Sequence, residues 1–361
     1  MRPSEQAVVC VPARDEVRCL PRLLRSLAAQ DGLSAGTPLR VLIVANNCTD
    51  GTVAAVRAME AAGEAPALAI RVIEAHLEPA EAHVGTARRM ALDAGAAWLD
   101  ADGHPDGILL TTDADARVPR TWLAANLRAL EGAEIVGGRL VIDPEQETDP
   151  ALADLHDRIE RYWAAVRRIE DALDPPPHDP APRHGDHTGA SLALRAALYR
   201  SVGGLPALPR GEDNALVARV REAGGRLRHC PEVSVMVSDR AAGRAQGGMA
   251  TEMVRRAVTA RAGLPYRLPA PSHWEAVIAR RAALRSVFRG TAGPGRLAAL
   301  AAFGLTAADL ASISPDACVN DIAFVERAGP LCEAADGPAP EMELDAALAA
   351  FDTILRPSAA A

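Results

Sequence analysis

Four short apolar runs, each followed by a stretch with helical spacing, constrain the fold of this chain more than any other feature. The runs begin at Ala7, Leu39, Leu68 and Ile108, and the first three cover residues 7–11, 39–45 and 68–73. Continuous apolar runs of this length are typical of buried strands, and apolar residues three and four apart are typical of helices. Strands that alternate with helices pair in parallel through right-handed crossovers. The sequence therefore predicts a doubly wound α/β fold with a mostly parallel sheet.

The fourth apolar run ends in two carboxylates, Asp113 and Asp115, that are separated by one alanine. Residues i and i+2 of an extended chain point to the same side, so both acids can converge on one point. Two carboxylates this close repel each other, and a divalent cation with oxygen ligands relieves the repulsion. The pattern indicates a metal site at a strand end. The alternative is that Asp115 caps the helix that begins near Pro119 while Asp113 is simply solvated.

Polar side chains also follow the first two strands. They are Arg14, Asp15 and Glu16 after the first strand, and Asn46, Asn47, Thr49 and Asp50 after the second. Each has a local explanation, because Asp50-Gly51 suits a turn and Asp15 suits a helix cap. In doubly wound sheets, however, ligands bind beyond the carboxyl ends of the strands. Their joint placement at these ends favours a nucleotide or phosphate cleft.

Two adjacent arginines, Arg88 and Arg89, lie in the helix that is expected over residues 85–99 after the third strand. A guanidinium group can hold a diphosphate through two parallel hydrogen bonds. Neighbouring residues of a helix point in different directions, so a solvated helix face is the alternative for one of the pair.

Further along, residues 134–142 are expected to form a fifth strand, and residues 150–173 a polar helix with one apolar stripe. The proline-rich segment 174–182 cannot continue that helix, and the two segments together suggest an insertion beside the cleft. Glu212 and Asp213 then open another amphipathic helix. Capping and the helix dipole explain one such acid, but the chain supplies two behind a glycine.

Composition excludes several classes of protein. The formal net charge of -8 gives no reason to expect a nucleic acid partner. Six scattered cysteines without a C-x-x-C pair fit a reduced, cytoplasmic compartment and argue against zinc. The N-terminus lacks the apolar core of a signal peptide, and no run of eighteen apolar residues predicts a transmembrane segment. A peripheral position at the inner membrane face stays open.

Six short motifs carry a resemblance to a known family. They occur in order as V-V-C-V-P-A-R-D-E at 8–16, V-A-N-N-C-T-D-G-T at 44–52, D-A-D at 113–115, G-A-S-L-A-L-R at 189–195, G-G-L at 203–205 and G-E-D-N-A-L at 211–216. Together they resemble the family 2 glycosyltransferases of the GT-A fold over roughly residues 6–238. Each motif alone is weak, but their common order and spacing make the resemblance specific.

The resemblance implies an inverting transfer of a sugar, of the hexosyltransferase type, from a nucleotide-diphosphate sugar donor to the hydroxyl of an unknown acceptor. A divalent metal, Mg or Mn, is implied at Asp115 and Asp113. Asp213 matches the position of the catalytic base, and Glu212 that of a neighbour that binds or orients the acceptor. The positions expected to bind the donor are Pro12, Arg14, Glu16, Asn46, Asp50, Arg88, Asp113 and Arg244.

The chain departs from the family pattern at informative places. Asn46 stands where many relatives have acidic residues that bind uracil, so uridine is not implied over guanosine. Met90 replaces an amide that is common in relatives. Asp186 and His187 precede the G-A-S motif, where acceptor contacts are expected, and a purely structural histidine is the alternative.

The resemblance ends near residue 240. We therefore expect a GT-A domain over residues 1–240, with the insertion at about 150–185, and a mainly helical C-terminal region over 241–361. Arg240 and Arg244 suit a loop that closes over a diphosphate or a plain linker. The C-terminal region carries no assignable motif, so packing against the catalytic domain or a homodimer partner is expected.

Two other classes of function stay open. A sugar-phosphate nucleotidyltransferase shares the alternating fold, but the V-P-A-R-D-E segment lacks the Gly-rich loop that such an enzyme needs. A catalytically silent relative could bind a nucleotide, although it would have no need of Asp113, Asp115 and Asp213 together.

Overall fold

The computed structural model describes residues 6–33, 36–143, 149–237, 249–290, 293–334 and 336–356. The chain divides into two compact units. The first unit contains Met1–Glu147, Pro182–Val220 and Arg226–Thr251, and the second contains Thr148–Ala181, Arg221–Gly225 and Glu252–Ala361.

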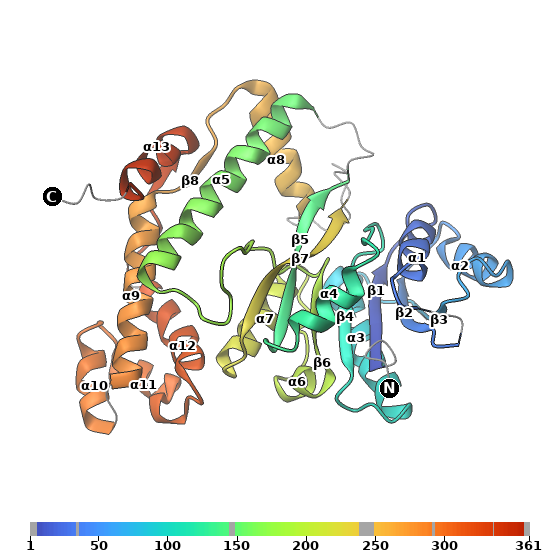
Figure 1. The fold of residues 1–361 in the computed structure, drawn as a ribbon, viewed down its shortest axis with the longest axis horizontal. Helices are drawn as coiled ribbons and strands as arrows, with labels where there is room; N and C mark the ends of the chain where they lie inside the picture. The colour runs from blue at the N-terminus through green and yellow to red at the C-terminus, as the bar shows by residue number, and fades with distance from the viewer. Residues whose placement is uncertain are drawn as a thin grey trace. The chain divides into compact units, whose positions relative to one another are not determined.

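A seven-stranded sheet forms the centre of the first unit, in the order β3-β2-β1-β4-β6-β5-β7 (Figure 1). Strands β1 to β4 pair in parallel, β6 runs antiparallel to both β4 and β5, and β5 runs parallel to β7. The mostly parallel α/β sheet is therefore confirmed. The strands are β1 (Ala7–Ala13), β2 (Leu39–Asn46), β3 (Leu68–Ala75), β4 (Ile108–Thr111), β5 (Ile135–Ile142), β6 (Leu192–Arg195) and β7 (Leu227–Val237).

Helices follow the strands as the apolar spacing predicts. They are α1 (Leu20–Ala28), α2 (Thr52–Ala61), α3 (Val84–Ala101), α4 (Trp122–Ala129), α6 (Ala196–Ser201) and α7 (Glu212–Glu222). The central strand β1 is buried on both faces. Val9 and Val11 belong to one core with Leu23 of α1, and Val8 and Cys10 belong to another with Leu92 of α3. Because both faces of the sheet are covered, polar groups can collect only at its edges and ends.

The second unit is built mainly from helices, with one short two-stranded sheet. Its elements are α5 (Pro150–Leu173), α8 (Met249–Ala262), β8 (Arg267–Pro269), α9 (Pro271–Gly290), α10 (Gly293–Ala301), α11 (Ala307–Ile313), the 3-10 helix η2 (Pro315–Ala317), α12 (Asp321–Ala334), β9 (Glu341–Glu343) and α13 (Leu344–Ile354). The apolar stripe predicted for α5 is buried at Leu155, Ile159 and Tyr162. It packs against Ile278 of α9 and Phe351 of α13.

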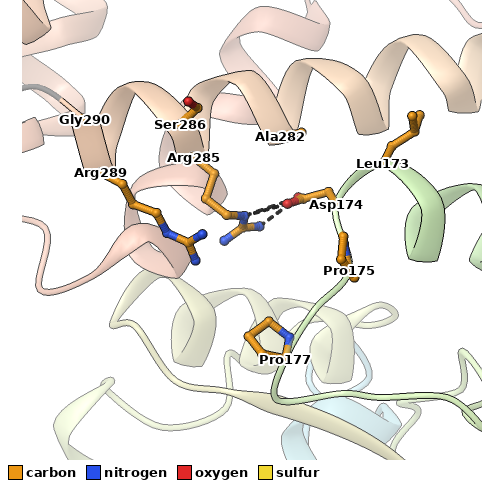
Figure 2. A pocket seen from close by; sticks show the side chains of 9 residues that line it. All are labelled: Leu173, Asp174, Pro175, Pro177, Ala282, Arg285, Ser286, Arg289 and Gly290. Carbon is orange, nitrogen blue, oxygen red and sulfur yellow. Dashed lines mark hydrogen bonds and ion pairs between the residues drawn. The ribbon is translucent and has the colours of Figure 1, made fainter.

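An ionic cluster joins the end of α5 to α9 and α12. Arg285 donates hydrogen bonds to Asp174 (Figure 2) and to Asp321, and Arg289 donates to Asp321 as well. Asp174, Arg285 and Arg289 border a pocket of about 530 Å³ that Pro175 and Pro177 also line.

The boundaries of the two compact units differ from those of the domains expected from the sequence. Helix α5 packs with the C-terminal helices because its apolar stripe belongs to their core. The boundaries 1–240 and 241–361 stay a prediction. All six cysteines are free thiols. No helix in the described part of the chain combines the length and apolar character that crossing a bilayer requires.

Phe351→Ala tests the core of the second unit. Phe351 is fully buried and contacts Tyr162 edge to face, with ring centroids 5.2 Å apart. Truncation should lower the free energy of unfolding of this unit by about 3–5 kcal/mol, measured by urea denaturation. Asp352→Ala, at the exposed neighbouring position, should change it by less than about 0.5 kcal/mol. Equal effects of the two substitutions would contradict the assigned packing.

Candidate functional site

The guanidinium group of Arg88 forms the centre of the site, and only 3% of the residue is exposed. It donates four hydrogen bonds to four residues. Nε donates to Glu212 Oε1 (3.1 Å), Nη1 to Thr111 Oγ1 (2.8 Å) and to the Gly189 carbonyl (2.7 Å), and Nη2 to Asp113 Oδ1 (2.8 Å). One buried cation therefore ties together four segments that lie far apart in the sequence.

The sheet topology brings these segments together. Arg88 comes from α3, Thr111 and Asp113 from the carboxyl end of β4, Gly189 from the turn before β6, and Glu212 from the first residue of α7. A Cβ atom at Gly189 would overlap the Arg88 guanidinium. The glycine of the G-A-S motif is thus required by this close approach.

Asp213 lies beside this network. Its Oδ2 accepts a hydrogen bond from the Gly189 amide and its Oδ1 one from the Asn214 amide, both at 2.8 Å. Gly211, with φ of +70°, turns the chain into α7. Glu212 is buried against Arg88, whereas Asp213 is half-buried. The two adjacent acids therefore occupy different environments, which the sequence did not distinguish.

Negative charge exceeds positive charge at this point. Burial by itself lowers the pKa of Arg88, but the carboxylates of Asp113, Glu212 and Asp213 raise it, so the pKa lies above its ordinary value. Arg88 is therefore a permanent cation, and it faces three carboxylates. The remaining negative charge favours the binding of a further cation.

The two acids after β4 fit a metal that is shared with a ligand. The Asp113 side chain is 36% exposed and Asp115 is half-buried. Among the described residues, no three His, Cys, Asp or Glu side chains are grouped as a complete metal site. Mg²⁺ is commonly held by one or two carboxylates together with substrate phosphates, so this donor set fits such an ion.

The loops after β1 and β2 are bonded to each other. Asp15, with φ of +50°, accepts a hydrogen bond from the Thr49 amide (2.7 Å). Asp50 accepts from the amides of Val17 (3.0 Å) and Thr52 (2.9 Å). Slight burial raises the pKa of Asp50, but these hydrogen bonds and that of the Thr52 hydroxyl outweigh it and lower the pKa. Asp50 therefore holds the turn that precedes α2, in line with the turn chemistry of the Asp50-Gly51 step.

The Glu16 amide joins the same loop by donating to Thr52 Oγ1 (2.8 Å). Arg14 is exposed and donates to the Ala82 carbonyl (2.7 Å). Pro12 is buried within β1, where it pairs with Val44 of β2. The structure thus places all three at the carboxyl ends of the strands, as predicted, while their contacts with a donor stay a prediction.

Asn46 is the last residue of β2 and is 2% exposed. Its Nδ2 is 3.4 Å from the His83 carbonyl, and within the described residues its buried Oδ1 has no hydrogen bond partner. A buried acceptor without a partner costs about 1–3 kcal/mol. This orphaned oxygen suits a ligand that brings an N–H group.

The two adjacent arginines of α3 have separate surroundings. Arg88 faces the site, whereas the Arg89 side chain is 49% exposed and pairs with Asp93 (3.5 Å). Arg89 borders a surface pocket of about 530 Å³ together with His83 and Pro209. Arg89 therefore lies on the solvated face of α3, which was the alternative for one of the two arginines.

Arg240 and Arg244 lie outside the described residues. Two members of the network, Thr111 and Gly189, were missed as site residues. Gly189 stood within a recognised motif, and only its missing side chain pointed to a close contact. Thr111 carried no signal, because a threonine at the end of a strand is common.

The family model described as Glycosyl transferase family 2 matches residues 8–180. No curated protein matches the chain. Among solved structures, the chain is similar to S. aureus TarS 1–349 in complex with UDP-GlcNAc. The alignment covers 91% of this chain and 91% of the TarS chain, at 13% identity and a TM-score of 0.47. Mannosyltransferase PcManGT from Pyrobaculum calidifontis, in complex with GDP-Man and Mn2+, covers 92% and 88%, at 20% identity and a TM-score of 0.44.

The mostly parallel α/β sheet is of the GT-A type, in agreement with the family match. The match over residues 8–180, a little under half of the chain, confirms the resemblance to glycosyl transferase family 2 that the sequence motifs carry.

Arg88→Met tests the network. It leaves Glu212 buried without a cation, which should lower the free energy of unfolding by about 3–5 kcal/mol. The loss in free energy of unfolding should be smaller at acidic pH. An uncompensated buried carboxyl group has a raised pKa, so its protonated form is favoured as the pH falls. Arg89→Met is the matched control and should change stability by less than about 0.5 kcal/mol. Urea denaturation at pH 7.5 and 5 measures both, and a pH-independent deficit would argue against a buried ion pair.

Proposed function

We propose that this protein transfers a hexosyl group from a nucleotide-diphosphate sugar to an acceptor hydroxyl with inversion at the anomeric carbon. One observation carries the proposal: a single buried arginine holds Asp113 of the strand end and Glu212 of the α7 start, next to Asp213. A metal-binding acid and a candidate base are thereby held at one place, as a displacement reaction on a diphosphate sugar requires.

In this proposal, Asp113 and Asp115 form the binding site for the metal and the diphosphate. These residues would hold Mg²⁺ or Mn²⁺ together with the phosphates of the donor. A bound divalent ion neutralises the charge that develops on a diphosphate leaving group. The excess of carboxylates around Arg88 supports this assignment, because it leaves negative charge that a cation can balance.

Asp213 is the proposed base. As the acceptor oxygen bonds to the anomeric carbon, the bond from that carbon to the diphosphate breaks and the hydroxyl proton passes to the Asp213 carboxylate. The amides of Gly189 and Asn214 hold this carboxylate in one orientation. Glu212 is buried and bonded to Arg88, so we assign it the role of positioning the start of α7.

Arg88 itself is better suited to positioning than to binding the diphosphate directly. Its hydrogen bonds run to Glu212, Thr111, Gly189 and Asp113, all within the protein. A ligand that used the same N–H groups would have to break this network in a buried place.

Asn46 is proposed to contact the nucleotide base through its orphaned Oδ1. Both uracil and guanine carry an N–H group that can donate to such an oxygen, so the residue admits uridine and guanosine donors. The remaining donor contacts, at Pro12, Arg14, Glu16, Asp50 and Arg244, are proposed from the family resemblance. A cytoplasmic location, a peripheral membrane contact and a homodimer stay predictions.

A thermal-shift panel tests the class of donor. The melting temperature should rise with one nucleoside diphosphate, UDP or GDP, and with its sugar, and more so with Mn²⁺ present, because ligands that bind the folded state stabilise it. Asp115→Ala should abolish the additional rise with metal and keep the metal-free value. If no nucleotide raises the melting temperature under any metal condition, the proposal fails.

Asp213→Asn tests the base. The amide oxygen can still accept the Gly189 hydrogen bond, so nucleotide binding with Mn²⁺ should stay within about twofold of the wild type, while turnover falls by about 10²–10⁴-fold through loss of the proton acceptor. Binding follows from the thermal shift and turnover from release of the nucleoside diphosphate. A parallel loss of both would remove Asp213 from the role of base.

A further inference from the structure

Three histidines that are not members of the Arg88 network lie together in the first unit. His187 Nδ1 and His229 Nε2 are 3.0 Å apart and share a hydrogen bond, and the ring of His184 lies 5.6 Å from that of His229. His184 Nδ1 accepts a hydrogen bond from the Asp186 amide (3.1 Å), so its Nε2 carries the proton and donates to the Cys230 carbonyl (3.2 Å). His184 is therefore held as a neutral ring.

The backbone of β5 explains why the histidines meet there. Gly137 pairs with His229 of β7, and the Asp186 carbonyl and the His187 Cα and Cβ atoms occupy the space that a Cβ at Gly137 would need. The pairing of β5 with β7 shifts register just after Gly137. Beyond the shift, the Leu140 amide donates to Asp186 Oδ2 (2.9 Å). The segment of Asp186 and His187 is thus docked on an irregular place in the sheet.

This docked segment leads directly into the candidate active site. Gly189 is two residues after His187, and the Ser191 amide donates to the Thr188 carbonyl (3.0 Å), which closes a tight turn. The Gly189 amide holds Asp213, and its carbonyl accepts from Arg88. Only one residue, Thr188, therefore separates His187 from the glycine that orients the proposed base.

We propose that His187 and His229 are positioning residues whose hydrogen bond holds the Gly189 turn in place and so keeps the Gly189 amide aimed at Asp213. This inference rests on the proposed function for its catalytic consequence, but the coupling between the imidazole pair and Gly189 is a property of the fold alone.

The pair makes the turn sensitive to acid. A hydrogen bond between two imidazoles needs one ring nitrogen with a lone pair, which is present when both rings are neutral or when one is protonated. When both are protonated, the two nitrogens are donors and the two charges repel. The bond is therefore present while at most one ring is protonated and is lost in acid that protonates both.

Among the described residues, strand pairing and sequence place further ionisable groups next to the pair on three segments. They are His184 and Asp186 in the same loop, Cys230 and Arg228 next to His229 on β7, and Arg139 beyond Gly137 on β5. Arg228 donates to the Pro182 carbonyl and Asp186 accepts from Leu140, so both have backbone partners. Gly137 itself contributes only backbone to the face where His187 lies.

The amide of Gly189 can be observed alone. Thr188-Gly189 is the single Thr-Gly step in the sequence. Protein with ¹³C-carbonyl threonine and ¹⁵N glycine therefore gives one signal in a carbonyl-filtered amide spectrum. Its proton shift reports the hydrogen bond to Asp213. We expect the wild-type signal to move as the pH is lowered from 7.5 until both rings are protonated.

Two substitutions of His229 separate the outcomes. In His229→Gln the amide donates or accepts at any pH, so the Gly189 signal should stay near its neutral wild-type position throughout. In His229→Phe the partner is lost, and the signal should be displaced at every pH. His273→Gln, in the second unit, is the control and should follow the wild type. A wild-type signal that does not move, or an equal movement in His229→Gln, would overturn the proposal.

The catalytic consequence is tested by measuring turnover with UDP-glucose and GDP-mannose as probes in the presence of Mn²⁺. His229→Phe should lower kcat by about 10–100-fold, since a small misplacement of a catalytic group has effects of this size. The affinity for UDP or GDP should stay within about twofold. His229→Gln should keep activity at pH 7.5 and retain more of it at pH 5.5 than the wild type does. If the wild type releases no nucleotide from either probe while Gly189 titrates as expected, the proposed function fails and the imidazole coupling stands.

Discussion

The structure of the site depends on the burial of one positive charge. A guanidinium group removed from water is stable only when anions and hydrogen bond acceptors surround it. Arg88 is 3% exposed and meets this requirement with Asp113, Glu212, Thr111 and the Gly189 carbonyl. Its partners come from three other segments, so satisfying this charge also sets the positions of those segments relative to α3. The residues proposed to bind metal and to accept a proton are thus aligned by the same interaction.

Close backbone approach is the second condition, and glycines supply it. Gly189 lies against the Arg88 guanidinium, and Gly137 lies against His187. A side chain at either place would separate groups that the site holds together. The glycines therefore act through contacts, and neither needs a left-handed backbone. Gly211 differs, because its φ of +70° lets the chain enter α7 with Glu212 and Asp213 at the helix start.

The sheet determines where such a site can exist. Both faces of β1 are packed against apolar cores, so a polar cluster at the middle of the sheet would lack partners. At the carboxyl ends, the loops after β1 and β2 satisfy one another through Asp15 and Asp50. Asn46, at the end of β2, differs from these loops, since its Oδ1 is buried without a partner in the described residues. An unsatisfied acceptor beside well-satisfied loops is the feature that a bound ligand would explain.

The order of apolar runs and helical stretches was sufficient to predict the parallel sheet, because strand burial and helix amphipathicity are periodic local properties. The motif residues Asp113, Glu212 and Asp213 were also recognisable, since their order along the chain survives without coordinates. The assignment of Arg88 rather than Arg89 to the site was not, because it depends on which face of α3 meets β4. The separate environments of Glu212 and Asp213, the role of Gly189 and the meeting of His187 with His229 required the folded chain. Each depends on distances between segments that are remote in sequence, and such distances are set by packing and strand register, which no local pattern encodes.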